Sequence, residues 1–188
     1  MTQCSYSFFL LFILSLVIFS AEGQGITTLQ AQPTETPHLL ELTAIVTSSE
    51  NYSTLECWSL SNEFETSNVG GIDGASVLAL GDYTDAQYTV LPPHFNGGKH
   101  NAPAPQLVVF ISGLANISTP ETGNYATVHG GRNGAIIAVD TAGSGHITMY
   151  PSNRETVGLV FPFAGGVVPG HNVAHDGPCR RQSIREMA

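Results

Sequence analysis

From residue 61 onward the sequence alternates short apolar runs with turns rich in glycine and proline. Runs of strand length spaced about 8–12 residues apart are typical of β-sandwiches and β-barrels. This part of the chain carries no apolar stripe of helical period over about twelve residues. We therefore predict an all-β domain, with strands over residues 76–80, 87–91, 106–112, 115–118, 125–129, 134–141, 146–150 and 157–163.

The segment before residue 61 is less regular. Residues 55–60 have the composition of a strand and include the only tryptophan, whereas residues 39–46 alternate weakly and fit a strand or a short helix. Residues 61–74 are rich in Asn, Glu, Ser and Gly and predict a loop. After Phe163 the chain is rich in glycine and proline, and we expect it to wrap the outside of the domain.

The first 23 residues have the organisation of a secretory signal. Residues 8–19 are apolar and uncharged, too short for a comfortable membrane span, and small residues follow at 20–23. We predict cleavage after Gly23 and a secreted, extracellular protein without membrane association; the alternative is an uncleaved anchor. Beyond the signal we predict a flexible leader (24–38), one domain (39–179) and a basic tail (180–188).

Two cysteines, Cys57 and Cys179, follow the signal, since Cys4 would be removed with it. In an oxidising compartment two cysteines most simply form one disulfide; the alternative is two buried free thiols. Asn51 and Asn116 begin Asn-x-Ser sequences, which predict glycosylated surface positions.

The charge of the chain excludes some partners. The formal net charge is −9, and Lys99 is the only lysine. Three of the arginines, Arg180, Arg181 and Arg185, lie in the tail, so the domain is more acidic than the whole chain. Such a surface argues against nucleic acids and anionic membranes as partners. We expect a small-molecule ligand or substrate and, as a further partner, a second copy of the chain.

The stretch 92–113 carries the most promising chemistry. A polar loop after Pro93 contains His94 and His100, and the strand 106–112 follows and ends at Gly113. Both faces of that strand are largely apolar, as in a barrel packed inside and covered outside. Gln106, at its start, would lie near the mouth of the barrel, where it could orient a ligand or satisfy a rim hydrogen bond.

This arrangement resembles the first motif of the cupins, in which His-x-His precedes a glutamate that begins a strand closed by glycine. Here Gln106 replaces the glutamate and Gly113 closes the strand, while His100 lies near the second histidine position with Gly98 in the first. Alternatively, His94 is the first histidine, displaced by an inserted Gly-Gly loop. The second cupin motif resembles residues 134–146, with one extra residue, Asp140 in place of proline and His146 at the end.

The resemblance covers roughly residues 75–163 and extends to the small secreted cupin-like proteins of filamentous fungi. It implies a single-domain jelly-roll β-barrel and a metal site of His94 and/or His100, Gln106 and His146. Imidazole and oxygen ligands suit Fe, Mn, Ni, Cu or Zn. The implied function is a small-molecule enzyme, either a metal-dependent oxygenase or an isomerase or cyclase, acting on a secondary metabolite.

Other readings of the same residues stay open. Without a metal, His100 and His146 in an apolar pocket are candidate acid–base catalysts, because imidazole titrates near neutral pH. A non-catalytic barrel that binds a sugar or another small ligand is the alternative function. His129 is a weaker site candidate, His171 and His175 are expected at the surface, and His38 lies in the leader. Nucleophile-elbow and phosphate-loop motifs are absent from the sequence.

Overall fold

The computed structural model describes residues 39–180, so the predicted signal, leader and all but the first residue of the tail lie outside the described residues. The described chain consists of strands with one short 3-10 turn, η1 (Ala164–Gly166). The strands are β1 (Leu39–Thr47), β2 (Ser53–Glu63), β3 (Glu65–Thr66), β4 (Ser76–Val77), β5 (Gln87–Leu91), β6 (Phe95–His100), β7 (Gln106–Ser112), β8 (Leu114–Thr119), β9 (Asn124–His129), β10 (Ala135–Ala138), β11 (His146–Tyr150), β12 (Thr156–Pro162) and β13 (His171–Asp176). Residues 39–180 contain no helix with the length and apolar character needed to cross a membrane. The all-β class predicted from the sequence is confirmed.

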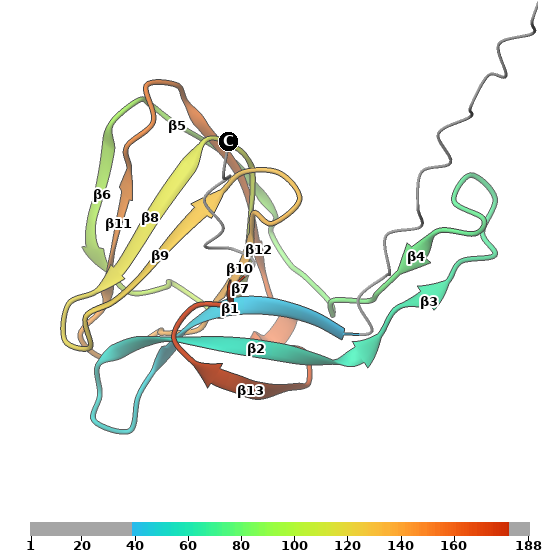
Figure 1. Ribbon diagram of the computed structural model, residues 1–188, viewed down its shortest axis with the longest axis horizontal. Helices are drawn as coiled ribbons and strands as arrows, with labels where there is room; N and C mark the ends of the chain where they lie inside the picture. The colour runs from blue at the N-terminus through green and yellow to red at the C-terminus, as the bar shows by residue number, and fades with distance from the viewer. Residues whose placement is uncertain (1–38, 181–188) are drawn as a thin grey trace, which may run out of the picture. The chain divides into compact units, whose positions relative to one another are not determined.

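Two sheets make up most of the domain (Figure 1). The larger has seven strands in the order β13-β2-β1-β10-β7-β12-β5, and the smaller has four in the order β6-β11-β8-β9. Strands β3 and β4 pair separately. Pairing is antiparallel except between β1 and β10, which run parallel. Within the described residues, neither large sheet closes into a barrel by itself.

The core lies on both faces of the seven-stranded sheet. One cluster combines residues of both sheets, such as Ile45 and Phe110 from the larger and Ile117 and Val128 from the smaller. A second cluster, which includes Leu42 and Trp58, lies on the opposite face. Because neighbouring side chains of a strand point to opposite faces, β1 contributes to both clusters and its residues 42–46 are all buried. Burial on both faces explains why its apolar pattern alternates only weakly.

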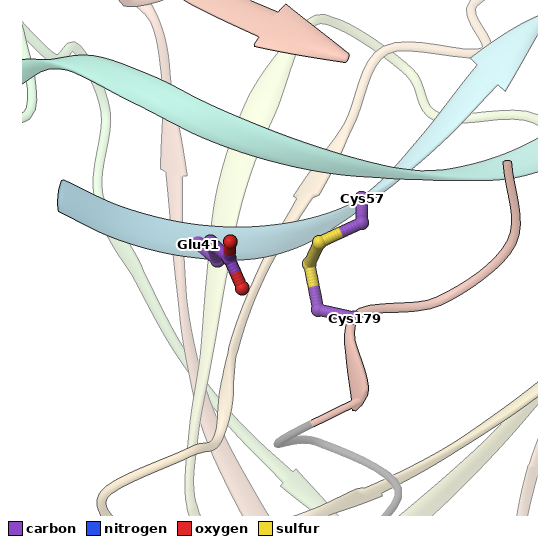
Figure 2. A group of neighbouring side chains, drawn as sticks. All are labelled: Glu41, Cys57 and Cys179. Atoms are coloured by element: carbon purple, nitrogen blue, oxygen red, sulfur yellow. A yellow bond between two sulfur atoms is a disulfide. The ribbon is translucent and has the colours of Figure 1, made fainter. Parts of the chain in front are cut away.

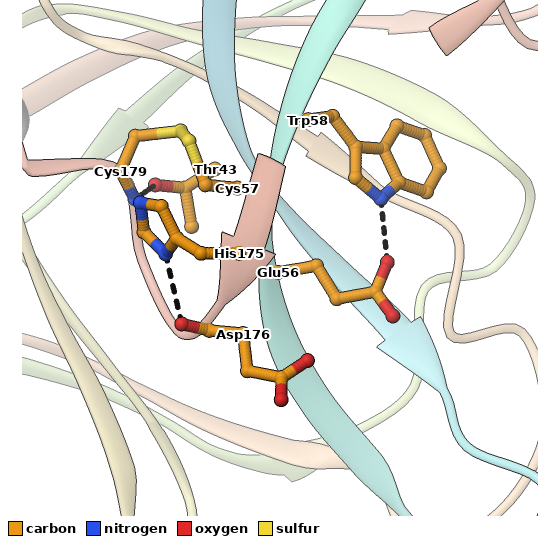
Figure 3. The surroundings of a disulfide bond; sticks show 7 residues. All are labelled: Thr43, Glu56, Cys57, Trp58, His175, Asp176 and Cys179. Atoms are coloured by element: carbon orange, nitrogen blue, oxygen red, sulfur yellow. Dashed lines mark hydrogen bonds between the residues drawn. A yellow bond between two sulfur atoms is a disulfide. The ribbon is translucent and has the colours of Figure 1, made fainter. Parts of the chain in front are cut away.

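The predicted disulfide between Cys57 and Cys179 is confirmed. Figure 2 shows it joining strand β2 to the segment after β13, with Glu41 of β1 nearby. Both cysteines are buried, and the backbone N–H of Cys179 donates a hydrogen bond to Thr43 Oγ1 at 2.9 Å (Figure 3). The C-terminal segment is therefore fixed to the middle of the β1–β2 pair by a covalent bond and a buried hydrogen bond.

Three strands lie where the sequence predicted irregular structure: β3, which lies in the predicted loop 61–74, β6 and β13. Strand β6 occupies the predicted loop that carries the histidines, because its pairing with β11 outweighs the turn preference of Gly97 and Gly98. Strand β13 lies in the predicted C-terminal wrap and pairs with β2 at the edge of the sheet. Most of its side chains are exposed, so no alternating apolar pattern marks it. The predicted strand 76–80 is reduced to β4.

The two glycosylation positions differ in their surroundings. Asn51 is exposed in the turn between β1 and β2. Asn116 lies half-buried in β8, and its Oδ1 atom is buried without a hydrogen-bond partner among residues 39–180. Glycosylation at both positions stays a prediction, and the geometry favours Asn51 as the accessible one.

Gly113, the residue that follows β7, is expected to be intolerant of substitution. Its φ is +85°, and an added Cβ would lie 2.6 Å from Thr156 Cα and 2.8 Å from Thr156 Cβ. Gly123 has a similar φ of +70° but open space around it. Left-handed backbone costs alanine about 1–2 kcal/mol at either site, and the clash should add about 1–3 kcal/mol at Gly113. Urea unfolding of Gly113→Ala and Gly123→Ala measures the difference; equal losses of stability would contradict it.

Candidate functional site

A cavity of about 130 Å³ is lined by residues of both sheets. Its wall is mostly apolar, and its polar residues are His100, Gln106, His146, Thr148 and Tyr150. The apolar lining consists of Ile45, Ala102, Pro103, Val108, Phe110, Ile117, Ile136, Ala138 and Val160. Since no lysine, arginine, aspartate or glutamate lines it, the cavity suits a neutral ligand with few polar atoms.

His146 and Asp140 form a buried pair beside the cavity. His146 is 4% exposed, Asp140 is fully buried, and His146 Nδ1 lies 2.8 Å from Asp140 Oδ2. Ser53 donates a second hydrogen bond to the same carboxylate oxygen at 2.7 Å. A carboxylate that accepts from Ser53 acts as an acceptor for the imidazole too, so the Nδ1 atom carries the proton. The Nε2 atom of His146 is then left with a free lone pair.

The loop between β10 and β11 places the Asp140 carboxylate. Asn101 Nδ2 donates to the carbonyl oxygens of Asp140 and Ala142, and Thr47 Oγ1 donates to that of Ala142. Ser144 Oγ accepts from the backbone N–H of Ser53. The loop is therefore tied to the β1–β2 turn and to the end of β6. The second carboxylate oxygen of Asp140, Oδ1, is buried and has no hydrogen-bond partner within residues 39–180.

His100 lies directly opposite His146 in the β6–β11 pair. Their ring centroids are 4.5 Å apart, but His100 is exposed whereas His146 is buried. His100 Nδ1 lies 3.1 Å from the carbonyl oxygen of Gly98, which can only accept, so this nitrogen also carries the proton. The two imidazoles thus connect the buried end of the site to solvent.

Thr148 and Tyr150 follow His146 on the same face of β11, since they are two and four residues further along the strand. Thr148 is 4% exposed and lines the cavity, and its neighbours across the sheet, Gly98 and Ile117, have no side-chain group that could bond its hydroxyl. Burial raises the pKa of Tyr150 to about 12, so the phenol stays protonated at neutral pH. The strand therefore presents a row of three polar side chains to an otherwise apolar cavity.

The structure brings three of the four predicted metal-site residues to this cavity, namely His100, Gln106 and His146. His94 does not line it: this residue is exposed in the turn between β5 and β6 at a φ of +59°. His129 is exposed at the end of β9 and also lies outside the lining.

The two C-terminal histidines have other surroundings. His175 is exposed, with Nδ1 directed to a backbone oxygen (Figure 3). His171, predicted at the surface, is instead half-buried and stacked on Trp58, with ring centroids 3.5 Å apart.

Sequence reasoning missed Asp140, Ser53, Thr148 and Tyr150 as parts of the site. Asp140 was noted only as a substitute for the proline of a motif. Thr148 and Tyr150 could have been found from the period-two alternation that starts at His146. Ser53 carries no such signal, because the turn geometry that brings it to Asp140 depends on contacts far away in the sequence.

A different group of potential metal ligands is not a metal site. Within residues 39–180, one group of at least three His, Cys, Asp or Glu side chains has all its ligand atoms within 4.8 Å of one another. It consists of Glu41, Cys57 and Cys179 (Figure 2). Both sulfur atoms are consumed by the disulfide, so neither is a thiolate that could bind a metal.

At the cavity, the metal donors are two imidazoles and one neutral amide. The Nδ1 hydrogen bonds of His100 and His146 leave both Nε2 atoms free, and a carboxylate partner on Nδ1 is common for histidines that bind metals. Asp140 itself is occupied in this supporting role. The donor set could thus hold a divalent transition metal, with fewer anionic ligands than most such sites have. Comparisons with protein-family models and with curated proteins found no match to this chain.

Proposed function

We propose that the protein is a small-molecule enzyme of the isomerase or cyclase type, in which His146 acts as the general base. The observation that carries this proposal is the buried His146–Asp140 pair, 2.8 Å apart, at the wall of an apolar cavity. A histidine held in one tautomer by a buried carboxylate has a fixed lone pair on its other nitrogen. The apolar lining keeps that lone pair from being masked by bulk water.

In the proposed reaction, His146 Nε2 removes a proton from a carbon of the substrate. Asp140 keeps the ring oriented and stabilises the imidazolium that forms. His100, at the exposed end of the imidazole pair, exchanges protons with solvent. Isomerisation follows when the imidazolium returns the proton to a different atom of the substrate.

For the fold we propose a cupin-like jelly roll formed by the seven- and four-stranded sheets together. Two observations support this proposal. Strand β7, which resembles the strand of the first cupin motif, is followed by Gly113. In the smaller sheet, His146 lies opposite His100. The proposal accounts for the cavity between residues of both sheets. It also fits the secreted location predicted from the first 23 residues.

A base in an apolar cavity can be tested before the substrate is known. The probe 5-nitrobenzisoxazole is small, neutral and aromatic, and a base that removes its C3 proton breaks the N–O bond and releases a yellow phenolate. We expect the purified protein, treated with a chelator, to accelerate this reaction with saturation kinetics. Asp140→Asn should slow it by about tenfold or more, because the amide no longer holds the catalytic tautomer. A rate equal to that of buffer would contradict the proposal and favour a non-catalytic binding protein.

A metal-dependent reaction at the same residues is the second candidate, favoured by the two free Nε2 atoms and by Gln106. The metal would be held by His100, Gln106 and His146, and when bound it would polarise a substrate oxygen. Because it would occupy the Nε2 lone pair of His146, the metal and the general base are alternatives.

Metal analysis of the protein after purification decides between them. Stoichiometric Fe, Mn, Ni, Cu or Zn that is lost in both His100→Ala and His146→Ala would favour the metal. Retention of the metal in His94→Asn serves as the control, since His94 lies outside the cavity.

A further inference from the structure

Thr148 lies in an environment where valine would be the expected residue. It is in the middle of β11, 4% exposed, and β-branched residues of this shape pack well in strands. Its neighbours across the sheet are Gly98 on β6 and Ile117 on β8, and neither has a side chain that can accept or donate a hydrogen bond. The hydroxyl therefore lacks a side-chain partner across either neighbouring strand.

Within residues 39–180, the buried side-chain atoms without a hydrogen-bond partner are Asn116 Oδ1 and Asp140 Oδ1, and the Thr148 hydroxyl is not one of them. Thr148 instead keeps a small exposed fraction of 4% at the cavity. Thr148 lines the cavity, two residues further along β11 than His146 and on the same face of the strand. A ligand in the cavity that touches the His146 imidazole is thus within reach of the Thr148 side chain as well. An oxygen of such a ligand would give the Thr148 hydroxyl the partner that Gly98 and Ile117 do not supply.

We propose that Thr148 is a catalytic residue that donates a hydrogen bond to an oxygen of the substrate, and that the substrate class is small, neutral, enolisable carbonyl compounds. This inference rests on the proposed function of His146 as a base. No lysine or arginine lines the cavity to pair with an anionic substrate, and a hydroxyl donor suits an oxygen that gains negative charge during the reaction.

The step balances without a further reactant. His146 Nε2 takes the proton from the carbon next to the carbonyl group, and the C–H electron pair forms a C=C bond. The carbonyl π electrons move onto oxygen, where the Thr148 O–H hydrogen bond stabilises the enolate. The imidazolium then returns the proton to another carbon of the conjugated system, which gives an isomer with no net oxidation or reduction.

The test uses 5-nitrobenzisoxazole, whose ring oxygen becomes negatively charged as the proton leaves. Thr148→Val removes the hydroxyl and keeps the shape of the side chain. We expect kcat/KM to fall by about tenfold or more, with a melting temperature equal to or above that of the unchanged protein. Thr127→Val is the matched control, because Thr127 lies in β9 of the same sheet and outside the cavity lining. Its kcat/KM should equal that of the unchanged protein.

The results for these variants distinguish a failure of the role assigned to Thr148 from a failure of the proposed function of His146. If kcat/KM of Thr148→Val is within twofold of that of the unchanged protein while His146→Asn is inactive, the role assigned to Thr148 is contradicted and the proposed function stands. If His146→Asn is as active as the unchanged protein, both are wrong. A tenfold loss in Thr148→Val accompanied by a lower melting temperature would also overturn the inference, because it would indicate a structural role for the hydroxyl.

Discussion

Replacing His146 should reduce the rate of proton removal from 5-nitrobenzisoxazole by about 100-fold or more, the lower end of the contribution of a positioned general base. The expected loss is large because His146 is the histidine that a buried carboxylate fixes through Nδ1. His100 is exposed and is held only by a backbone oxygen, so His100→Ala should cost less. Initial rates of phenolate release, measured at several probe concentrations, give kcat/KM for each variant.

Two variants of His146 separate loss of the base from loss of the fold. His146→Ala leaves the Asp140 carboxylate buried without its imidazole partner, which should itself destabilise the domain. His146→Asn keeps an N–H donor close to the position of Nδ1 and removes the Nε2 lone pair. We expect His146→Asn to remain folded and inactive. His94→Asn is the control for histidine content, and a loss of activity in it would contradict the placement of the site.

Removing the disulfide should cause the second large effect, a loss of about 4–5 kcal/mol in the free energy of unfolding. Cys57 and Cys179 are 122 residues apart, so the bond restricts nearly the whole unfolded domain. In the chain-entropy model, a bond that closes so long a loop is among the more stabilising ones. Urea unfolding of the Cys57→Ala/Cys179→Ala variant against the unchanged oxidised protein measures the difference.

Reduction of the unchanged protein provides the control for that measurement. If the covalent bond is the cause, the reduced protein and the double variant should unfold at similar urea concentrations. At low denaturant the double variant should keep its activity toward the probe, because the cysteines do not line the cavity. A loss of stability below about 1 kcal/mol would mean that packing and the Thr43 hydrogen bond hold the C-terminal segment without the bond.

Much of the fold could be predicted from local sequence patterns. The strand 106–112 was predicted with the bounds of β7, and 87–91 with those of β5, because apolar β-branched runs between turn residues leave few alternatives. Strands β6 and β13 could not be predicted, since one contains two glycines and the other is an exposed edge strand. Their conformation depends on pairing partners distant in the sequence.

The residues of the candidate site also fall into those that the sequence predicted and those that it could not predict. His100, Gln106 and His146 were predicted together from the order and spacing of motifs, and the structure places all three at one cavity. Which of His94 and His100 faces it could not be decided from spacing, because that depends on the β6–β11 register. The pairing of His146 with Asp140 was not predicted either. Ser53, which bonds the same carboxylate, meets Asp140 only when the β1–β2 turn packs on the loop before β11.

The parallel pairing of β1 with β10 has a consequence for how the chain folds. Thr43 is paired with Ile136, so the centre of the larger sheet joins segments from opposite halves of the domain. During synthesis, β1 and β2 can form a hairpin early, but the second edge of β1 stays unpaired until β10 has been made. An unpaired apolar edge of this kind is prone to associate with other chains. We therefore expect slow refolding and aggregation that increases with protein concentration, as is typical of domains dominated by distant contacts.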